Sequence, residues 1–366
     1  MRVFLLIGAV QALFFALLVF SKKSKNAADK VLGFWLVALS VNLILPYLAY
    51  LNITKYYYLG TLSAFLFPML SVWLFLYTRT LTSKSFNKKW LGHFIMLLIV
   101  GLAFIPYYSQ NAEEIFQGFG DPDSLSFALM IGPLTNFGVF AAYTMKSLTT
   151  LQKHKKNIRF EFSYTESIDL NWIRYLVFSL LALTVVFLVL LLLVFITGIS
   201  LSGFDLTLYL YLVAFIFGIG YMGFKQGTIF RYSAEQAPQQ MDGKNDSKIN
   251  SQNNKSIDEE LMQKLNDHMR SKKPYLNPKL SLYDLASSYG IPSNALSTHL
   301  NRFQQTNFYE YVNYYRVQEA KIRLKENKHK FTILSIAYDC GFNSKASFNR
   351  IFKNITGFTP SEYVNR

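Results

Sequence analysis

Two stretches near the C-terminal end of the 366-residue chain carry polar and basic side chains at the spacing of an exposed helix face. Short hydrogen-bonding side chains at such positions suit contacts to the base edges and phosphates of nucleic acid. In the first stretch they are Asn294, Ser297, Thr298, Asn301 and Arg302. In the second stretch they are Lys345, Asn349, Arg350 and Lys353. The two sets together predict a surface that binds double-stranded DNA.

The cations of the second stretch are expected to play different roles. Arg350 carries a planar fork that can form two hydrogen bonds to guanine, a contact that discriminates between bases by about 1–3 kcal/mol. Lys353 carries a point charge suited to phosphate, which adds affinity without selecting a sequence. Sequence reading is therefore assigned to Arg350 and general attraction to Lys353.

No other chemistry is indicated by the residue types and their spacing. His299 and His329 are isolated, and the sequence contains no nucleophile–base set and no glycine-rich phosphate loop. Cys340 is the only cysteine, which excludes an intrachain disulfide. We interpret it as a small buried residue rather than a redox sensor. The sequence thus predicts no enzyme, no cofactor and no metal site.

The elements that must position the two polar faces follow one plan written twice, within Leu280–Phe303 and Phe331–Lys353. Each copy has a small residue in a first helix, a glycine at a turn and a second helix with an apolar spine, the pattern of a helix-turn-helix. The two motifs are placed at about residues 280–304 and 331–355. The expected small residues and turn glycines are Ala286, Gly290, Ala337 and Gly341.

Apolar spacing indicates which residues of these helices face inward. The first spine comprises Leu296, Leu300 and Phe303, and the second comprises Phe348, Ile351 and Phe352. Ser293 and Ser344 are predicted as the N-caps of the two second helices. Asn307–Asn327 reads as one connecting helix, about 30 Å long at 1.5 Å per residue. One turn of DNA is about 34 Å, so the two units could enter successive major grooves.

The last 90 or so residues resemble the AraC-type DNA-binding domain. FNRIFKNITGFTPSEYVNR (348–366) resembles its end, SIAYDCGFNSKASF (335–348) resembles the preceding portion, and LSLYDLASSYGIPSNALSTHLNRF (280–303) looks like its first half. The resemblance covers about Lys273–Arg366 and implies a bacterial transcription regulator that grips promoter DNA with two units. The first unit departs from the family in having Arg302 as its only basic residue on the second helix.

The first 230 residues have a different composition from a soluble protein. The whole chain is 51% hydrophobic and only 16% charged, against about 25% charged in a normal globular chain. Seven apolar runs approach the roughly 20 residues that cross a bilayer as a helix. They predict seven transmembrane helices at Val3–Phe20, Val31–Tyr50, Leu59–Thr78, Leu91–Tyr108, Leu125–Met145, Ile173–Thr197 and Leu206–Phe224.

Alternate loops between these runs differ in charge. The first, third and fifth loops carry Lys22, Lys23, Lys25, Lys30, Arg79, Lys84, Lys88, Lys89, Lys146, Lys153, Lys155, Lys156 and Arg159. The other loops contain Lys55 as their only cation, and the fourth is acidic between Glu113 and Asp123. Because cytoplasmic loops are enriched in Lys and Arg, the N-terminus is expected outside and the C-terminal domain in the cytoplasm.

Residues 231–256 are rich in Gln, Asn, Ser, Lys and Asp and have no apolar period, as expected of a flexible linker. The predicted organisation is thus all-α: a transmembrane sensor domain (1–230), this linker, and an AraC-type DNA-binding domain (257–366). The net charge of the whole chain is +15. Most of the basic excess before the last domain is explained by the cytoplasmic loops.

These features predict a membrane-bound one-component transcription regulator of the inner membrane, whose transmembrane domain perceives a signal. Its expected partners are promoter DNA and the lipid bilayer. RNA polymerase, a second copy of the chain and an unidentified effector are further partners that the sequence leaves open. The alternative is a receptor or transporter whose cytoplasmic tail binds proteins. A third reading is a sensor of the physical state of the membrane that takes no ligand.

Overall fold

The structure is a computed structural model that describes residues 2–23, 25–51, 53–83, 87–95, 127–166, 168–197, 204–226, 254–326 and 331–365. Within these ranges the chain forms helices and no β-strand, which confirms the predicted all-α class. It divides into two compact units, and the second comprises Lys153–Asp169 together with Arg231–Arg366. The first comprises Met1–Gln152 and Leu170–Phe230.

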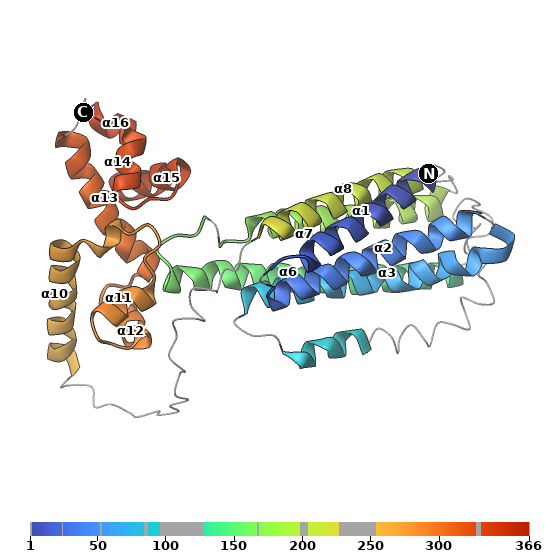
Figure 1. Ribbon diagram of the computed structural model, residues 1–366, viewed down its shortest axis with the longest axis horizontal. Helices are drawn as coiled ribbons and strands as arrows, with labels where there is room; N and C mark the ends of the chain where they lie inside the picture. The colour runs from blue at the N-terminus through green and yellow to red at the C-terminus, as the bar shows by residue number, and fades with distance from the viewer. Residues whose placement is uncertain are drawn as a thin grey trace. The chain divides into compact units, whose positions relative to one another are not determined.

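Unit 1 is built from long apolar helices, seen as the blue, green and yellow ribbons of Figure 1. They are α1 (Arg2–Phe20), α2 (Ala27–Leu51), α3 (Ile53–Thr82), the first part of α6 (Phe127–Glu161), α7 (Asn171–Thr197) and α8 (Phe204–Lys225), with a short 3₁₀ turn at Lys88–Leu91. α2 packs against α1 and α3, and α1 also packs against α8.

The helices of unit 1 are apolar on their exposed faces as well as on their buried ones. α1 buries Leu5, Ala9, Ala12, Ala16 and Val19 in the bundle but exposes Val3, Ile7, Val10, Phe14 and Leu17. A helix that is apolar all round belongs either to the core of a large protein or to a membrane. Among the described residues, three helices are long and apolar enough to span a bilayer, at Val3–Phe20, Ala27–Leu51 and Asn171–Leu190.

The number of spans therefore stays a prediction. Six of the seven predicted runs coincide with α1, α2, α3, α6, α7 and α8. The predicted run Leu91–Tyr108 lies outside the described residues beyond Ile95, as does the acidic loop Glu113–Asp123. Most of the predicted linker is likewise outside them, and helix α10 begins at Asn254, inside its predicted end at residue 256.

In unit 2, helix α13 (Phe308–Glu326) lies between the two helix-turn-helix motifs in the chain. In Figure 1, α14, α15 and α16 gather at one end of α13 and α10, α11 and α12 at the other. The remaining bounds are α10 (Asn254–Lys272), η3 (Pro274–Leu276), α11 (Leu282–Ser288), α12 (Ser293–Phe303), α14 (Ile333–Asp339), α15 (Lys345–Thr356) and α16 (Pro360–Val364). The end of α6 and the residues after it complete the unit.

Helix α13 contributes to two separate hydrophobic cores. Phe308, Tyr311 and Val312 near its start pack with Leu285, Leu296 and Leu300 of the first motif. Val317, Ala320 and Leu324 near its end pack with Ile336, Phe348 and Phe352 of the second. The buried apolar residues of one helix therefore fix both motifs, which is how the predicted connecting helix positions the two polar faces.

Candidate nucleic-acid interface

The first helix-turn-helix is formed by α11 and α12. Ser281 caps α11 by accepting a hydrogen bond from the backbone N–H of Asp284, whose carboxylate accepts in return from the N–H of Ser281. Gly290 makes the turn with a φ of +72°. The predicted cap at Ser293 is wrong, because Pro292 takes the N-cap position with extended backbone and Ser293 is already helical.

The exposed face of α12 carries the residues expected there. Leu296 and Leu300 are buried as predicted, while the side chain of Phe303 lies outside the described part. The other side of the helix presents Asn294, Ser297, Thr298, Asn301 and Arg302, of which Ser297 is half-buried and the rest are exposed. The amide of Asn301 donates to the backbone oxygen of Ser297 at 2.9 Å, so this side chain is folded back along its own helix.

The second helix-turn-helix is formed by α14 and α15, and α15 has a defined cap at each end. Ser344 caps α15 as predicted, accepting from the backbone N–H of Ser347 at 3.1 Å. Gly357 ends the helix in the left-handed conformation. The spine of Phe348, Ile351 and Phe352 is buried. Lys345, Arg350 and Lys353 are exposed and Asn349 is half-buried, so the structure brings the four predicted residues onto one helix.

Arg350 is exposed but makes a contact that the sequence did not indicate. Its Nη2 donates to the hydroxyl oxygen of Tyr309 on α13 at 3.3 Å. The guanidinium of Arg159, near the end of α6, lies over the ring of the same tyrosine, 5.7 Å from the ring centroid. Arg350, which is predicted to read guanine, is thus hydrogen-bonded to the connecting helix α13.

Arg316 is the central residue that the sequence analysis missed. It is 1% exposed and donates hydrogen bonds to the backbone oxygens of Tyr275 and Asn277, both at 2.8 Å. Burial lowers its pKa to about 10, so the guanidinium remains charged at neutral pH. Arg316 stands in the apolar register of α13, four residues after Val312 and four before Ala320, and this position was the available signal.

A buried carboxylate lies beside this arginine on the same helix. Glu319 accepts from Lys273 and Arg323, each at 2.9 Å, and from the hydroxyl of Tyr275 at 3.2 Å. Burial alone would raise the pKa of Glu319, but the hydrogen bonds from Lys273 and Arg323 outweigh that effect and lower it. The carboxylate therefore stays ionised and fastens α13 to the residues after α10.

Cys340 ends α14 and is fully buried in the second core. Burial raises the pKa of its thiol to about 12, so the thiol is protonated at neutral pH. A protonated, inaccessible thiol is a poor nucleophile, which agrees with the interpretation of Cys340 as a packing residue.

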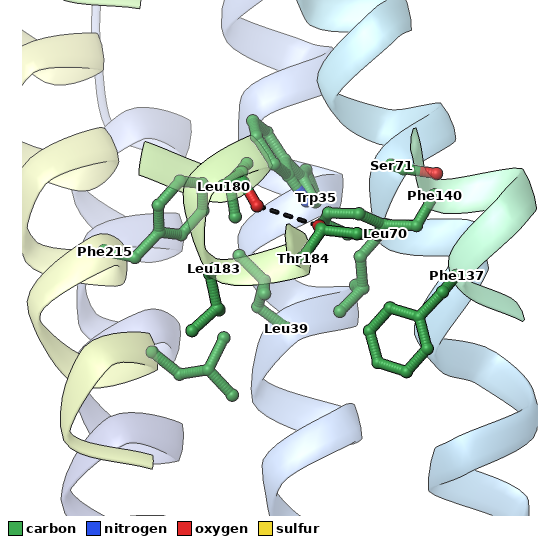
Figure 2. Close-up of a pocket in the computed structure, with 11 residues that line it drawn as sticks. Trp35, Leu39, Leu70, Ser71, Phe137, Phe140, Leu180, Leu183, Thr184 and Phe215 are labelled. Carbon is green, nitrogen blue, oxygen red and sulfur yellow. Dashed lines mark hydrogen bonds between the residues drawn. The ribbon is translucent and has the colours of Figure 1, made fainter. Parts of the chain in front are cut away.

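Unit 1 contains a small apolar cavity of about 50 Å³ between its helices (Figure 2). Trp35, Phe137, Phe140, Leu180 and Phe215 are among its lining residues. The indole Nε1 of Trp35 is buried and has no hydrogen-bond partner within the described part of the chain. Sites for small-molecule ligands occupy roughly 300–1,000 Å³. The cavity is therefore too small to be assigned to an effector.

Residues 285–366 match the family described as a helix-turn-helix domain. An uncharacterized HTH-type transcriptional regulator from Staphylococcus aureus strain COL is 34% identical over 89 residues, which are 24% of this chain and 12% of that protein. The uncharacterized HTH-type transcriptional regulator YpdC from Escherichia coli K12 is 33% identical over 92 residues, 25% of this chain and 31% of that protein.

A solved structure of a protein of unknown function from Listeria innocua is 28% identical, covering 29% of this chain and 95% of that chain, with a TM-score of 0.26. The chain spans about a third or less of the two curated relatives. The C-terminal domain is an AraC-type helix-turn-helix domain, which confirms that resemblance. Both curated relatives carry the name of HTH-type transcriptional regulators.

Proposed function

We propose that this chain is a membrane-bound one-component regulator of transcription. Its AraC-type domain binds promoter DNA, and its N-terminal helices perceive the signal that controls binding. The observation that carries the proposal is the pair of exposed polar and basic faces on α12 and α15, both held by α13. α13 has 19 residues and is therefore about 28 Å long, close to one turn of DNA.

Membrane insertion is supported by the surface of unit 1. Large apolar side chains are exposed on successive turns of α1 and α7, where water would disfavour them. The basic loops on alternate sides support an N-terminus outside the cell and a cytoplasmic C-terminal domain at the inner membrane. The end of α6 and the residues after it belong to the fifth predicted loop, one of the basic set, and pack in unit 2. That packing agrees with a cytoplasmic position for the loop.

The signal would control DNA binding through unit 1. The effector would act on unit 1, and a second copy of the chain would let two weak DNA contacts reinforce each other through their high effective concentration. RNA polymerase is the expected downstream partner at the promoter. A sensor of the physical state of the membrane would use the same architecture without a ligand.

The decisive experiment is genome-wide mapping of the DNA bound by the full-length, membrane-inserted protein. The double variant Lys345→Ala/Arg350→Ala should lose discrete binding sites because it removes two cations from α15. The control Arg270→Ala/Lys272→Ala removes the same charge from exposed positions on α10 and should retain them. A receptor or transporter whose tail binds proteins would yield no discrete sites for any of the three proteins.

A further inference from the structure

The end of α6 and the residues that follow it lie against the start of the first helix-turn-helix motif and against α13. We call residues 153–166 the docking segment. Phe162 forms an antiparallel bridge with Ser281, the residue that caps α11. Ser163 adds two hydrogen bonds to the backbone oxygen of Leu280, from its N–H at 3.2 Å and from its hydroxyl at 2.6 Å. The segment thus pairs with the first residues of the first motif.

The other side of Ser163 is held by α13. Its backbone oxygen accepts from Nη1 of Arg316 at 3.0 Å and from the amide of Asn313 at 3.2 Å. Its hydroxyl oxygen also accepts from Nη2 of Arg316 at 3.0 Å. Phe162 and Ser163 are both buried. One short piece of chain from between α6 and α7 therefore occupies a notch lined by α13 and the start of the first motif.

The docking segment is linked through Tyr309 to Arg350, the residue predicted to read DNA. Arg159 lies over the ring of Tyr309, and the hydroxyl of that ring accepts from Arg350 on α15. The bond to Tyr309 uses one of the five N–H donors of the Arg350 guanidinium, and it fixes where the planar fork lies on α15. Because Arg159 lies over the ring, the docked segment stabilises the position of Tyr309 to which Arg350 is bonded.

The contacts of the notch are suited to being made and broken. Arg316 keeps its hydrogen bonds to the backbone oxygens of Tyr275 and Asn277 when Ser163 leaves. Water can replace the oxygens of Ser163, and a hydrogen bond within the protein is worth only modestly more than one to water, with the larger difference where the donor is the charged Arg316. Departure of the segment would therefore leave the cores of both motifs intact.

We propose that the docking segment is an intramolecular inhibitor of DNA binding, which occupies the Arg316 notch and withdraws Arg350 from DNA. This inference rests on the proposed function, because it names the contact through which unit 1 controls the domain. A signal that moves α6 or α7 would release Ser163 and Arg159 together. Tyr309 and Arg350 would then be free to rearrange on a promoter.

A reversible cross-link tests the proposal in the full-length protein. Paired residues in antiparallel bridges have Cα atoms about 4.5–5.5 Å apart, within the range that disulfides accept. The double variant Phe162→Cys/Ser281→Cys should therefore form a disulfide that locks the segment in place. The natural thiol of Cys340 is buried and protonated, so it should not compete.

Affinity for a promoter fragment is then measured on one sample before and after reduction. We expect the oxidised form of the double variant to bind about tenfold more weakly than its reduced form. For either single variant, the affinity should be the same before and after reduction. Equal or tighter binding by the oxidised form would overturn the proposal, as would failure of the disulfide to form. If the reduced double variant, the single variants and the unmodified chain all fail to bind any genomic fragment, the proposed function itself is wrong.

A matched pair of substitutions separates the inhibitory contact from simple charge. Arg159→Ala removes the cation over Tyr309, and we expect promoter affinity to rise about threefold or more. Lys156→Ala removes an exposed charge from the same helix and should leave affinity equal or slightly lower. If both variants weaken binding to the same degree, Arg159 acts by attracting phosphate and does not restrain Arg350. Tyr309→Phe, which deletes the acceptor for Arg350, should raise affinity as Arg159→Ala does.

Discussion

The two helix-turn-helix motifs have the same sequence plan, but their turn glycines lie in different surroundings. Gly290 has a φ of +72°, and a Cβ atom added there would meet nothing within 4 Å. Gly341 has a φ of +87°, and its Cβ would lie 2.5 Å from the backbone oxygen of Tyr275 and 3.0 Å from Nε of Arg316. The first turn is open, whereas the second is pressed against the centre of the domain.

The second helices of the two motifs, α12 and α15 (the recognition helices), also differ, and again the second motif is the more tightly constrained. α15 begins at a serine that caps it by a side-chain hydrogen bond, ends at a glycine and exposes three cations. α12 has a proline at its N-cap, which makes no side-chain cap hydrogen bond, and exposes Arg302 as its cation. A repeated pattern therefore does not imply equal roles. The second motif packs against Arg316 at its turn, and its second helix supplies three of the four exposed cations on the two polar faces. The first motif offers the backbone at Leu280 and Ser281 to which the docking segment pairs.

The turn glycines give the largest expected difference between the motifs. Gly341→Ala should destabilise the domain by about 3 kcal/mol or more, because left-handed strain adds to a clash with backbone that cannot move aside. Gly290→Ala should cost about 1 kcal/mol from strain alone. Hydrogen exchange of α13 amides in the full-length protein would measure both. Equal losses would show that the close packing at Gly341 has no energetic weight.

Replacing the arginines of the recognition helices should separate the motifs in DNA binding. Arg350→Ala should weaken binding to a selected promoter by about 1–3 kcal/mol, roughly 5- to 150-fold, and relax selection at one base pair. Arg302→Ala, near the end of α12, should cost less than about threefold and leave base preference unchanged. Titration of the two variants against promoter and scrambled duplexes tests this; a larger loss for Arg302→Ala would reverse the assignment.

The helix caps provide the smallest contrast. Ser344→Ala removes the acceptor for the N–H of Ser347 and should destabilise α15 by about 1 kcal/mol. Ser293→Ala should change stability by only a few tenths of a kcal/mol, because Ser293 makes no cap and alanine is a good helix former. Exchange rates of amides in the first turns of α12 and α15 would report the difference. A similar loss at both sites would restore Ser293 as a functional cap.

Most of unit 2 could be predicted from local pattern. The two turns, the connecting helix, the buried spines and the exposed faces of α12 and α15 all follow from apolar spacing and glycine positions, which act over a few residues. The cap at Ser293 was the local error, because a proline just before a serine can itself take the N-cap. The count of membrane spans stays a prediction.

The sequence by itself determined which residues lie on the exposed faces, because helical periodicity and φ preferences depend on neighbours in the chain. Only the tertiary structure placed Ser163 against Arg316, 153 residues away, and Arg159 over Tyr309. Ser163 is held largely through its own backbone oxygen and that of Leu280, groups that every residue possesses. Local sequence pattern does not specify contacts between groups so far apart in the chain, so the notch that joins the two parts of unit 2 emerges only when the chain is folded.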